Sequence, residues 1–582
     1  MHLFRPACLA AAAATVALLA GHATAQAADR ATELRQLRQQ ERQRINIFKA
    51  FFPDAETGRK AAISFHSVML EAHYADGYLV MELKPEQLTA LRGFGFRFEP
   101  AREFIAERNG MLDLIQQAAD ARQRAGGRAE DVGVQAIPGF SCYPTVEETF
   151  STAQGYVASH PTLATFTAVG NSWQKTQGQG GYDMNVLKLT NSAVAGPKPI
   201  LFITAAIHAR EYTTSPVALA FADWLVTGHG TDPDATWILD HHEVHLLLQS
   251  NPDGRKLAEA GALWRKNTNT AYCRSNADSR GADLNRNFTF DWNSTGGAGS
   301  SGNQCDETYR GPSPGSEPET QAIETYIRGI WPDRRGPSPA DAAPADTSGI
   351  HIDIHSYSQL VLWPWGDTAT PTGNATALQT LGRRLAFYNG YLPMQSIGLY
   401  PTDGTSDGPS YGELGVASFT IEQGNTFFEK CQVYTRSTKP KNLAALVYAA
   451  KVVRAPYQLP AGPDATAVSL GGGRRGVAAG TPVSLSAAIT DTQFNNSNGT
   501  QPTQAVMAAE AYVDVPPWTA GAVPIPLAAA DGTFDSPTEQ VGGTLPTTGL
   551  APGKHLVFVR GKAASGQFGP VSAGFLTIRS AQ

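Results

Sequence analysis

The pattern of hydrophobic and polar positions changes twice along the chain, and this predicts three regions. Residues 136–457 alternate short apolar runs with longer amphipathic stretches. The run at 200–206 has the length of a strand, and the apolar side chains from Val217 to Leu225 recur at helical spacing behind a capping Ser215. Such alternation of strands and helices is typical of an α/β sheet.

The same region contains further signals for individual elements. Apolar runs predict strands at 243–249, 350–354 and 416–421. Ser316 and Glu319 stand three residues apart before an amphipathic stretch, which predicts a capping box for a helix that reaches residue 330.

Residues 26–135 have a different pattern, with two charged stretches of helical length around a group of short apolar runs. The expected elements are helices at 32–51, 85–91 and 101–124 and strands at 63–71, 78–83 and 94–98. The order predicts a small α+β module. A linker with Arg122, Arg124 and Arg128 follows it.

Residues 458–582 are rich in Gly, Pro and Thr and show runs of period two, for example at 482–489 and 555–560. This pattern is typical of a small antiparallel β-sandwich. No residue of this region suggests catalysis, so we expect an accessory domain.

The first 25 residues have the features of a signal peptide. His2 and Arg5 precede an apolar run at 10–19, and small residues at 23–25 suit signal peptidase. The run is too short to anchor the chain in a bilayer, and no later stretch resembles a membrane span. We therefore expect an exported protein, secreted or periplasmic, without a membrane anchor.

Export changes the interpretation of the N-terminal module and of its basic linker. A small module joined by such a linker to a larger domain suggests a pro-segment that an endoprotease releases at the linker. The alternative is a permanent accessory domain. The net charge of −6 argues against a nucleic-acid partner, and we expect a monomer.

The cysteines fit an oxidising compartment. Without Cys8, which lies in the signal segment, four remain, and an even number in an exported chain favours disulfides. Spacing alone permits three pairings. We choose Cys273–Cys305, which is local to one insertion, and Cys142–Cys431, which ties the start of the middle region to its end.

Candidate chemistry is concentrated where strands of the middle region end. His208 and Glu211 follow the run at 200–206, and His355 follows the strand that ends at residue 354. Open α/β sheets place their sites at the carboxyl ends of strands, so these three side chains can meet. Two imidazoles and a carboxylate suit a catalytic zinc ion, and Glu422, which follows another strand, suits a general base.

At this point the sequence resembles a known family, the zinc carboxypeptidases of the A and B type, in a bacterial-like exported form. The resemblance covers roughly residues 140–455, in the order of the family's motifs. The motifs are His208-Ala209-Arg210-Glu211-Tyr212, Leu263-Trp264-Arg265-Lys266, Asp283-Leu284-Asn285-Arg286-Asn287, Glu307-Thr308-Tyr309-Arg310-Gly311, His355-Ser356-Tyr357-Ser358-Gln359 and Glu422. The resemblance implies a fold of the α/β class, a mixed twisted sheet with helices on both faces.

The resemblance also implies roles for individual residues. The metal ligands of one zinc ion per catalytic domain would be His208, Glu211 and His355, and the general base Glu422. Arg265 would hold the developing oxyanion, while Asp283 would orient the first histidine. The carboxylate of a peptide chain end would be bound by Asn285 and Arg286 and covered by Tyr400. A disulfide flanks the same motif in the animal enzymes, which supports Cys273–Cys305.

The specificity pocket departs from the family's pattern. The position that selects the C-terminal residue is Ser406, neither the aliphatic residue of A-type enzymes nor the acid of B-type enzymes. We expect Thr420 to face the same pocket, and Asp403 and Asp407 are close enough to affect a basic side chain. These features favour broad specificity.

The sequence thus predicts an exported precursor of a zinc exopeptidase that removes single C-terminal residues from peptides. One alternative is a related zinc amidase that acts on peptidoglycan stem peptides or acylated amino acids. The other is a catalytically inactive homologue that binds peptides. The full set of carboxylate-binding residues argues against the first, and Glu422 argues against the second.

Overall fold

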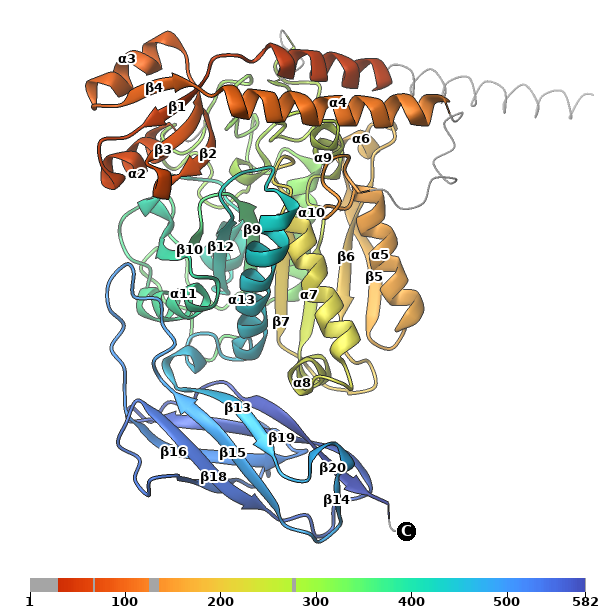
Figure 1. Cartoon of the computed structure of the whole chain (residues 1–582), viewed down its shortest axis with the longest axis vertical. Helices are drawn as coiled ribbons and strands as arrows, with labels where there is room; N and C mark the ends of the chain where they lie inside the picture. Colours follow the sequence, from red (N-terminus) through yellow and green to blue (C-terminus); the bar gives the residue numbers. More distant parts are fainter. Residues whose placement is uncertain (1–29, 66–67, 125–135, 275–278, 581–582) are drawn as a thin grey trace, which may run out of the picture.

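The structure is a computed structural model that describes residues 30–65, 68–124, 136–274 and 279–580. Three sheets follow one another along the chain and lie one above the other in space (Figure 1). The signal segment expected at 1–25, the linker residues 125–135 and with them Arg128 lie outside the described residues. Among the described helices, none has both the length and the apolar character needed to cross a membrane.

The N-terminal module contains an antiparallel sheet in the order β2-β3-β1-β4 and helices around it. Its elements are helical residues 30–43, β1 (Ile47–Phe51), α2 (Ala55–Ser64), β2 (Met69–His73), β3 (Tyr78–Glu82), α3 (Pro85–Gly93), β4 (Arg97–Pro100) and α4 (Arg102–Arg124).

Two sequence predictions for this module were wrong. Residues 47–51 form a strand instead of the end of a helix, because β1 lies between β3 and β4 and buries Ile47 and Ala50 completely. Residues 63 and 64 belong to the end of helix α2 instead of starting a strand. Asp54 caps the start of this helix by accepting a hydrogen bond from the backbone N–H of Thr57 at 2.8 Å.

The central sheet has eight strands in the order β11-β10-β12-β9-β7-β8-β6-β5. The strands are β5 (Ala164–Asn171), β6 (Asp183–Leu189), β7 (Ile200–Ala205), β8 (Glu243–Leu247), β9 (Ile350–Ser356), β10 (Leu360–Trp363), β11 (Leu392–Gln395) and β12 (Ala417–Gln423). The neighbours β8, β7, β9 and β12 are parallel, while β10 runs antiparallel to β12. The predicted mixed sheet is confirmed.

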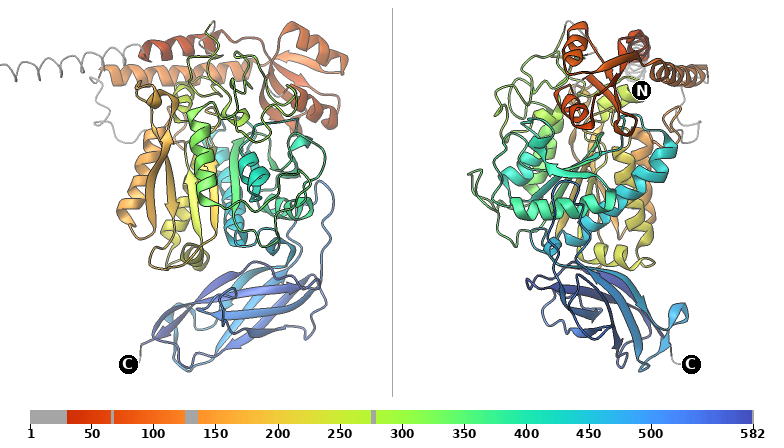
Figure 2. Two further views of the ribbon diagram at one scale, coloured as in Figure 1. Left: turned by 180° about the vertical axis from the view of Figure 1, so that it is seen from behind. Right: turned by 60° about the vertical axis from the view of Figure 1, so that its left-hand side comes forward.

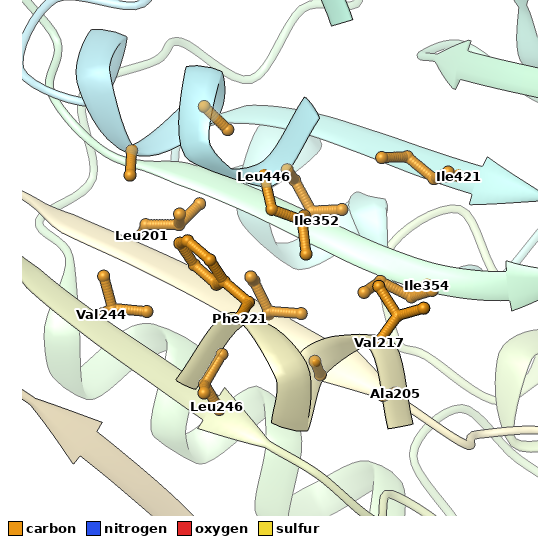
Figure 3. Close-up of a cluster of buried hydrophobic side chains, with 14 of the residues drawn as sticks. Leu201, Ala205, Val217, Phe221, Val244, Leu246, Ile352, Ile354, Ile421 and Leu446 are labelled. Atoms are coloured by element: carbon orange, nitrogen blue, oxygen red, sulfur yellow. The ribbon is translucent and has the colours of Figure 1, made fainter. Parts of the chain in front are cut away.

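Helices cover both faces of this sheet (Figures 1 and 2). They are α5 (Val146–Ser159), α6 (Trp173–Thr176), α7 (Thr214–Gly228), α8 (Pro233–His241), α9 (Pro252–Glu259), α10 (Pro318–Ile330), α11 (Ala375–Asn389), α12 (Cys431–Val433) and α13 (Lys439–Val452). Figure 3 shows Val217 and Phe221 of α7 against Leu201 of β7 and Ile352 of β9. On the opposite face, Phe202 packs in a second cluster with residues of α10. Alternate side chains of β7 therefore pack into two different hydrophobic cores, one on each face of the sheet.

Both predicted helix caps in this region were wrong. The N-cap of α7 is Thr213, and the hydroxyl of Ser215 accepts a hydrogen bond from Gln249 at 3.2 Å. The N-cap of α10 is Glu317, while Glu319 accepts a hydrogen bond from the backbone N–H of Trp173 at 2.6 Å. In both cases a contact with a distant segment replaces the local cap.

The C-terminal region forms a sheet in the order β13-β15-β18-β17-β16-β19-β20-β14 that folds into two layers (Figure 2). Its strands are β13 (Asp464–Leu470), β14 (Val477–Ala478), β15 (Val483–Thr490), β16 (Val506–Val513), β17 (Ile525–Ala529), β18 (Thr538–Leu545), β19 (Gly553–Ala563) and β20 (Ser572–Arg579). The strand β17 pairs with both β16 and β18 and so joins the two layers. Except for the short parallel pair of β14 and β20, neighbouring strands are antiparallel, as predicted.

Among the described residues there are two disulfides, which join the pairs chosen from the sequence. Cys142–Cys431 connects residues 289 positions apart, and Cys273–Cys305 closes a local segment of the insertion.

Candidate metal centre

Parallel strands bring the candidate ligands together at one edge of the central sheet. The loop after β7 carries His208 and Glu211, and a backbone hydrogen bond from Glu211 N to His208 O at 3.2 Å turns it back on itself. His355 is the second-last residue of β9, and it is paired in register with Glu422 of β12. Since residues paired in register share a face, both point to the same side of the sheet.

The three candidate ligands converge on one point. The Nδ1 atoms of His208 and His355 are 3.1 Å apart. Glu211 approaches His208 Nδ1 with Oε1 at 2.7 Å and His355 Nδ1 with Oε2 at 3.2 Å. All three side chains are buried, and they form a group that could hold a metal ion.

Two aspartates hold the other nitrogen of each ring. His208 Nε2 lies 3.1 Å from Asp283 Oδ1, and His355 Nε2 lies 2.9 Å from Asp353 Oδ2. Ionised carboxylates only accept hydrogen bonds, so each ring carries its proton on Nε2. Without a proton on either Nδ1, both lone pairs face each other and the Glu211 carboxylate. A cation between these three donors would satisfy all of them, and two nitrogens with one oxygen suit zinc.

The pKa shifts of the ligands have the same physical origin. Burial opposes ionisation of Glu211, yet the imidazoles of His208 and His355 lower its pKa. Burial likewise opposes a charge on His355, but the carboxylates of Asp353 and Glu211 raise its pKa well above the usual value. Glu211 is therefore stabilised as an anion, and its negative charge together with that of Asp353 stabilises positive charge on His355.

Glu422 differs from the other carboxylates of the centre. It is half-buried in the wall of the cavity. Burial raises its pKa to about 8, and the negative charge of Glu211 works in the same direction. A carboxylate with a raised pKa beside a metal centre has the property expected of a general base.

Next to the centre lies a group of cationic and amide side chains. Arg265 donates from Nε and Nη2 to Asp283 Oδ2 at 3.0 and 2.8 Å, so one aspartate contacts both a metal-centre histidine and this arginine. Arg286 donates to the backbone oxygens of Gly299 and Asn285 at 2.8 and 2.6 Å. These contacts hold the two guanidinium groups in fixed positions.

A cavity of about 450 Å³ connects these groups. Its wall includes the predicted site residues His208, Glu211, His355, Arg265, Asn285, Arg286, Tyr400, Thr420 and Glu422. The guanidinium of Arg286 lies 6.0 Å from the centre of the Tyr400 ring. The structure therefore brings nearly all the predicted side chains around one space.

Ser406 has a different position from the one expected. It is almost completely buried, and its hydroxyl donates to Asp353 Oδ2 at 2.5 Å while its backbone N–H donates to Asn285 Oδ1 at 2.9 Å. It supports two site residues instead of lining the cavity. Asp407, its neighbour in sequence, does line the cavity, and burial raises the pKa of its carboxyl.

The sequence analysis missed the contribution of Asp353. This aspartate is buried and lies two residues before His355, so the pleat of β9 places both on one face. It also accepts a hydrogen bond from the Thr204 hydroxyl at 2.7 Å. The alternation of His351, Asp353 and His355 was a usable signal, because a metal-binding histidine commonly has a carboxylate partner.

The N-terminal module contributes part of the cavity wall through Arg59, Ala62, Met69 and Tyr74. Its strand β2 reaches the segment that follows Glu422, where Ala72 N donates to Asn425 O at 3.2 Å. The module therefore covers the cavity that contains the candidate metal centre.

Comparison with known proteins agrees with this geometry. The profile of the family described as zinc carboxypeptidase matches residues 151–439. A zinc carboxypeptidase of Saccharothrix mutabilis subsp. capreolus is 32% identical over 364 residues, which cover 59% of this chain and 74% of the relative. Carboxypeptidase A2 of Mus musculus is 34% identical over 248 residues, or 42% of this chain and 52% of the relative.

Solved structures show the same fold. The crystal structure of thrombin activatable fibrinolysis inhibitor matches with a TM-score of 0.51 at 21% identity and covers 70% of this chain and 98% of that chain. Carboxypeptidase A from Helicoverpa armigera matches with a TM-score of 0.51 at 19% identity, over 71% of this chain and 97% of that chain.

Fold and site together define a metallocarboxypeptidase. The chain belongs to the zinc carboxypeptidase family, as its motifs suggested.

Proposed function

We propose that this chain is a zinc-dependent exopeptidase that removes single C-terminal residues from peptides, and that it is made as an exported precursor. The observation that carries the proposal is the common cavity. Arg286 and Asn285 line the same space as the candidate metal centre and Glu422. Arg265 could serve any peptide hydrolase by holding the oxyanion, but a second fixed cation, Arg286, suits an exopeptidase, because only an exopeptidase must bind a free carboxylate.

The residues around the candidate metal centre each have a role in the proposed hydrolysis of the peptide bond. Zinc held by His208, Glu211 and His355 would supply a Lewis acid that polarises the scissile carbonyl and makes a water more acidic. Glu422 takes a proton from the attacking water and then gives it to the leaving amine. Arg265 stabilises the negative charge that develops on the carbonyl oxygen.

Substrate binding depends on Asn285, Arg286 and Tyr400. Arg286 binds the terminal carboxylate with charge-assisted hydrogen bonds, and Asn285 adds an amide donor. Tyr400, at the cavity wall beside Arg286, covers the bound residue. Asp283 and Asp353 keep the metal-binding nitrogens of the two histidines free of protons.

The precursor proposal concerns residues 26–135 as a pro-segment. Two polar contacts outside the cavity and one apolar contact in its wall support a specific docking of this module. Glu41 accepts a hydrogen bond from Leu263 N at 3.1 Å, and Lys430 pairs with Glu107 at 3.0 Å. Met69 shares an apolar cluster with Tyr357 of the catalytic domain, residues 136–457. Cleavage in the basic linker would let the module leave and open the cavity to peptides.

A panel of substrates tests the exopeptidase proposal against an amidase that acts on peptidoglycan stems. Blocked dipeptides with C-terminal Ala, Leu, Phe, Lys and Arg are compared with muropeptides, each with and without a chelator. We expect chelator-sensitive release of the C-terminal residue from dipeptides. Hydrolysis of muropeptides alone would reject the proposal in favour of the amidase, and no hydrolysis of either would favour an inactive binding protein.

Limited trypsin treatment tests the precursor proposal separately. Cleavage at the linker is followed by mass spectrometry, and dipeptide hydrolysis is measured at each time point. We expect activity to rise as the fragment ending near residue 124 is released. Full activity of the uncut chain, or no gain after release, would show that the module is a permanent accessory domain. The monomer expected from the sequence and export to the periplasm or medium are part of the same proposal.

A further inference from the structure

Helix α9 starts just after strand β8 ends, at the same edge of the central sheet as the candidate metal centre (Figure 1). Strand β8 is the parallel neighbour of β7, so the turn into α9 and the loop after β7 leave the sheet side by side. We call residues 206–213 of that loop, which include His208 and Glu211, the metal loop. The structure describes all of α9, and none of its residues lines the cavity, so any role of this helix in the site is indirect.

Asn251 caps α9 and at the same time joins two segments of the site. Its Oδ1 accepts a hydrogen bond from Gly254 N at 3.1 Å, which is the cap. Its Nδ2 donates to Ile207 O at 3.1 Å, in the metal loop, and to Lys266 O at 3.0 Å. Arg265 O lies 3.4 Å from the same nitrogen. Because Asn251 is completely buried, these hydrogen bonds do not compete with bulk water.

Arg255 lies one helical turn after Asn251 and therefore on the same face of α9. It donates from Nη1 to Ala209 O at 3.3 Å and to Glu211 O at 3.1 Å, and from Nη2 to Tyr212 O at 3.3 Å. Its guanidinium also lies over the ring of Tyr212, 4.6 Å from the ring centre. Arg255 is completely buried. Its positive charge therefore interacts with the carbonyl groups of the metal loop, including that of the ligand Glu211.

A glycine at position 254 allows the close contact between α9 and the segment of Arg265. A Cβ atom on Gly254 would lie 2.6 Å from Lys266 O and 2.7 Å from the amide atoms of Asn251, distances that real Cβ atoms do not show. The other two segments also meet directly, because Ala209 N donates to Arg265 O at 3.2 Å. The metal loop, the start of α9 and the segment of Arg265 thus form one hydrogen-bonded unit.

The proposed reaction makes the relative position of these segments important. Arg265 stabilises charge on the same carbonyl oxygen that a zinc ion on His208 and Glu211 would polarise. An error of about 1 Å in such an arrangement can lower the rate on the order of 100-fold. The carbonyl groups that Asn251 and Arg255 hold belong to the segments that carry these functional side chains.

We propose that Asn251 and Arg255 are positioning residues, which fix the metal loop and Arg265 relative to each other from the buried side of the site. Arg255 holds the metal loop, and Asn251 connects it to the segment of Arg265. The part that concerns Arg265 rests on the proposed function, whereas the effect of Arg255 on metal binding does not. The two substitutions should therefore have different consequences.

The zinc affinity of the full chain tests Arg255 without any substrate, by competition with a colorimetric chelator. The control is Lys256→Met, because Lys256 is the next residue of α9 and pairs with Glu147 at 2.7 Å and with Glu259 instead of the metal loop. We expect Arg255→Met to bind zinc on the order of 100-fold more weakly and the control to match the parent chain. Arg255→Lys should lose about tenfold, since a lysine keeps the charge but cannot reach all three carbonyl oxygens.

Unchanged affinity of Arg255→Met, or an equal loss in Lys256→Met, would overturn the role of Arg255. If Arg255→Met does not fold, Arg255→Lys decides in the same way. This arm also separates the inference from the proposed function. A parent chain that binds zinc but hydrolyses no dipeptide would reject the proposed function, and the affinity of the Arg255 variants would still decide the inference.

Steady-state kinetics on blocked dipeptides test Asn251 in the full chain after limited trypsin treatment, at saturating zinc. Asn251→Ser keeps a side chain that can cap α9 but removes the amide that joins the two segments. We expect kcat to fall on the order of 100-fold, while KM and the zinc affinity stay close to those of the parent chain. If the serine variant does not fold, Asn251→Asp gives the same comparison, because it keeps the size of the side chain and the cap.

A double variant shows whether Asn251 acts through Arg265. In the Arg265→Ala chain, Asn251→Ser should lower kcat little further, because the group that it positions is already missing. A fall in kcat that is as large in the Arg265→Ala chain as in the parent chain would overturn the role of Asn251. So would an unchanged kcat of the single variant, or a rise in KM with kcat unchanged.

Discussion

Replacing Asp353 by Asn tests whether this buried carboxylate sets the metal-binding form of His355. The carboxylate accepts three hydrogen bonds, from Thr204 on Oδ1 and from Ser406 and His355 on Oδ2. An amide can accept on one atom only. If its NH₂ group takes the place of Oδ2, the imidazole of His355 must move its proton from Nε2 to Nδ1, the atom that faces the other ligands.

The size of the effect follows from the two orientations of the amide. With NH₂ toward His355, zinc binding requires the less stable tautomer, and we expect about 100-fold weaker affinity. With NH₂ toward Thr204, whose hydroxyl can rotate and accept, the bond to His355 survives without its charge, and the loss is about tenfold. The expected cost is therefore about 1.4–2.8 kcal/mol of zinc-binding free energy.

The assay is competition between the purified chain and a colorimetric chelator, which needs no substrate. Asp283→Asn is expected to weaken zinc binding in the same way through His208, because that pair has the same geometry. Asp346→Asn is the control, since this aspartate is exposed and pairs with Arg334 on the surface at 2.7 Å. If folded Asp353→Asn binds zinc as tightly as the parent chain, the assigned role of Asp353 is wrong.

Three further predictions concern other parts of the molecule. Glu422 acts as a base only when deprotonated, so kcat/KM should fall as the pH drops through its pKa. Burial raises this pKa to about 8, and bound zinc would lower it again. A pH profile without an acidic limb would contradict the role of Glu422 as the base. Arg286→Ala should lower kcat/KM for peptides with a free C-terminus by about 10- to 150-fold with unchanged zinc content, and an equal fall on an amidated peptide would contradict carboxylate binding. Arg384 of α11 is buried and pairs with Asp464 at 2.7 Å and with Asp491 at 3.0 Å, both of the C-terminal region. Arg384→Ala leaves the two aspartates buried without this partner and should destabilise the C-terminal sandwich by about 3–5 kcal/mol in urea unfolding, whereas an unchanged midpoint would refute the structural importance of these ion pairs.

The parts of the site that lie at strand ends could be predicted from the sequence. An apolar run fixes a buried strand, and parallel strands bring their carboxyl ends to one edge, so His208, His355 and Glu422 could be placed together without coordinates. The family resemblance added Arg265, Asn285 and Arg286, which no periodicity would have indicated. The fold class of the middle and C-terminal regions follows from periodicity in the same way.

Features that depend on contacts between distant segments could not be predicted. Residues 47–51 are a strand because β3 and β4 flank them, although the preceding sequence is helical. The side chains of Ser215 and Glu319 fit local caps, but both are used by partners far along the chain. Ser406 shows the same limit, since only the folded chain reveals that its hydroxyl bonds to Asp353 instead of lining the cavity.

The central claim is that a metal held by His208, Glu211 and His355 serves an enzyme that works from the free end of a peptide. Mass spectrometry of a peptide of ten residues incubated with the trypsin-treated chain tests it most directly. The account predicts a ladder of products that lose one C-terminal residue at a time, stopped by a chelator, restored by added zinc and absent with Glu422→Gln. Cleavage within the peptide, or a ladder that persists in the chelator or in the variant, would contradict it.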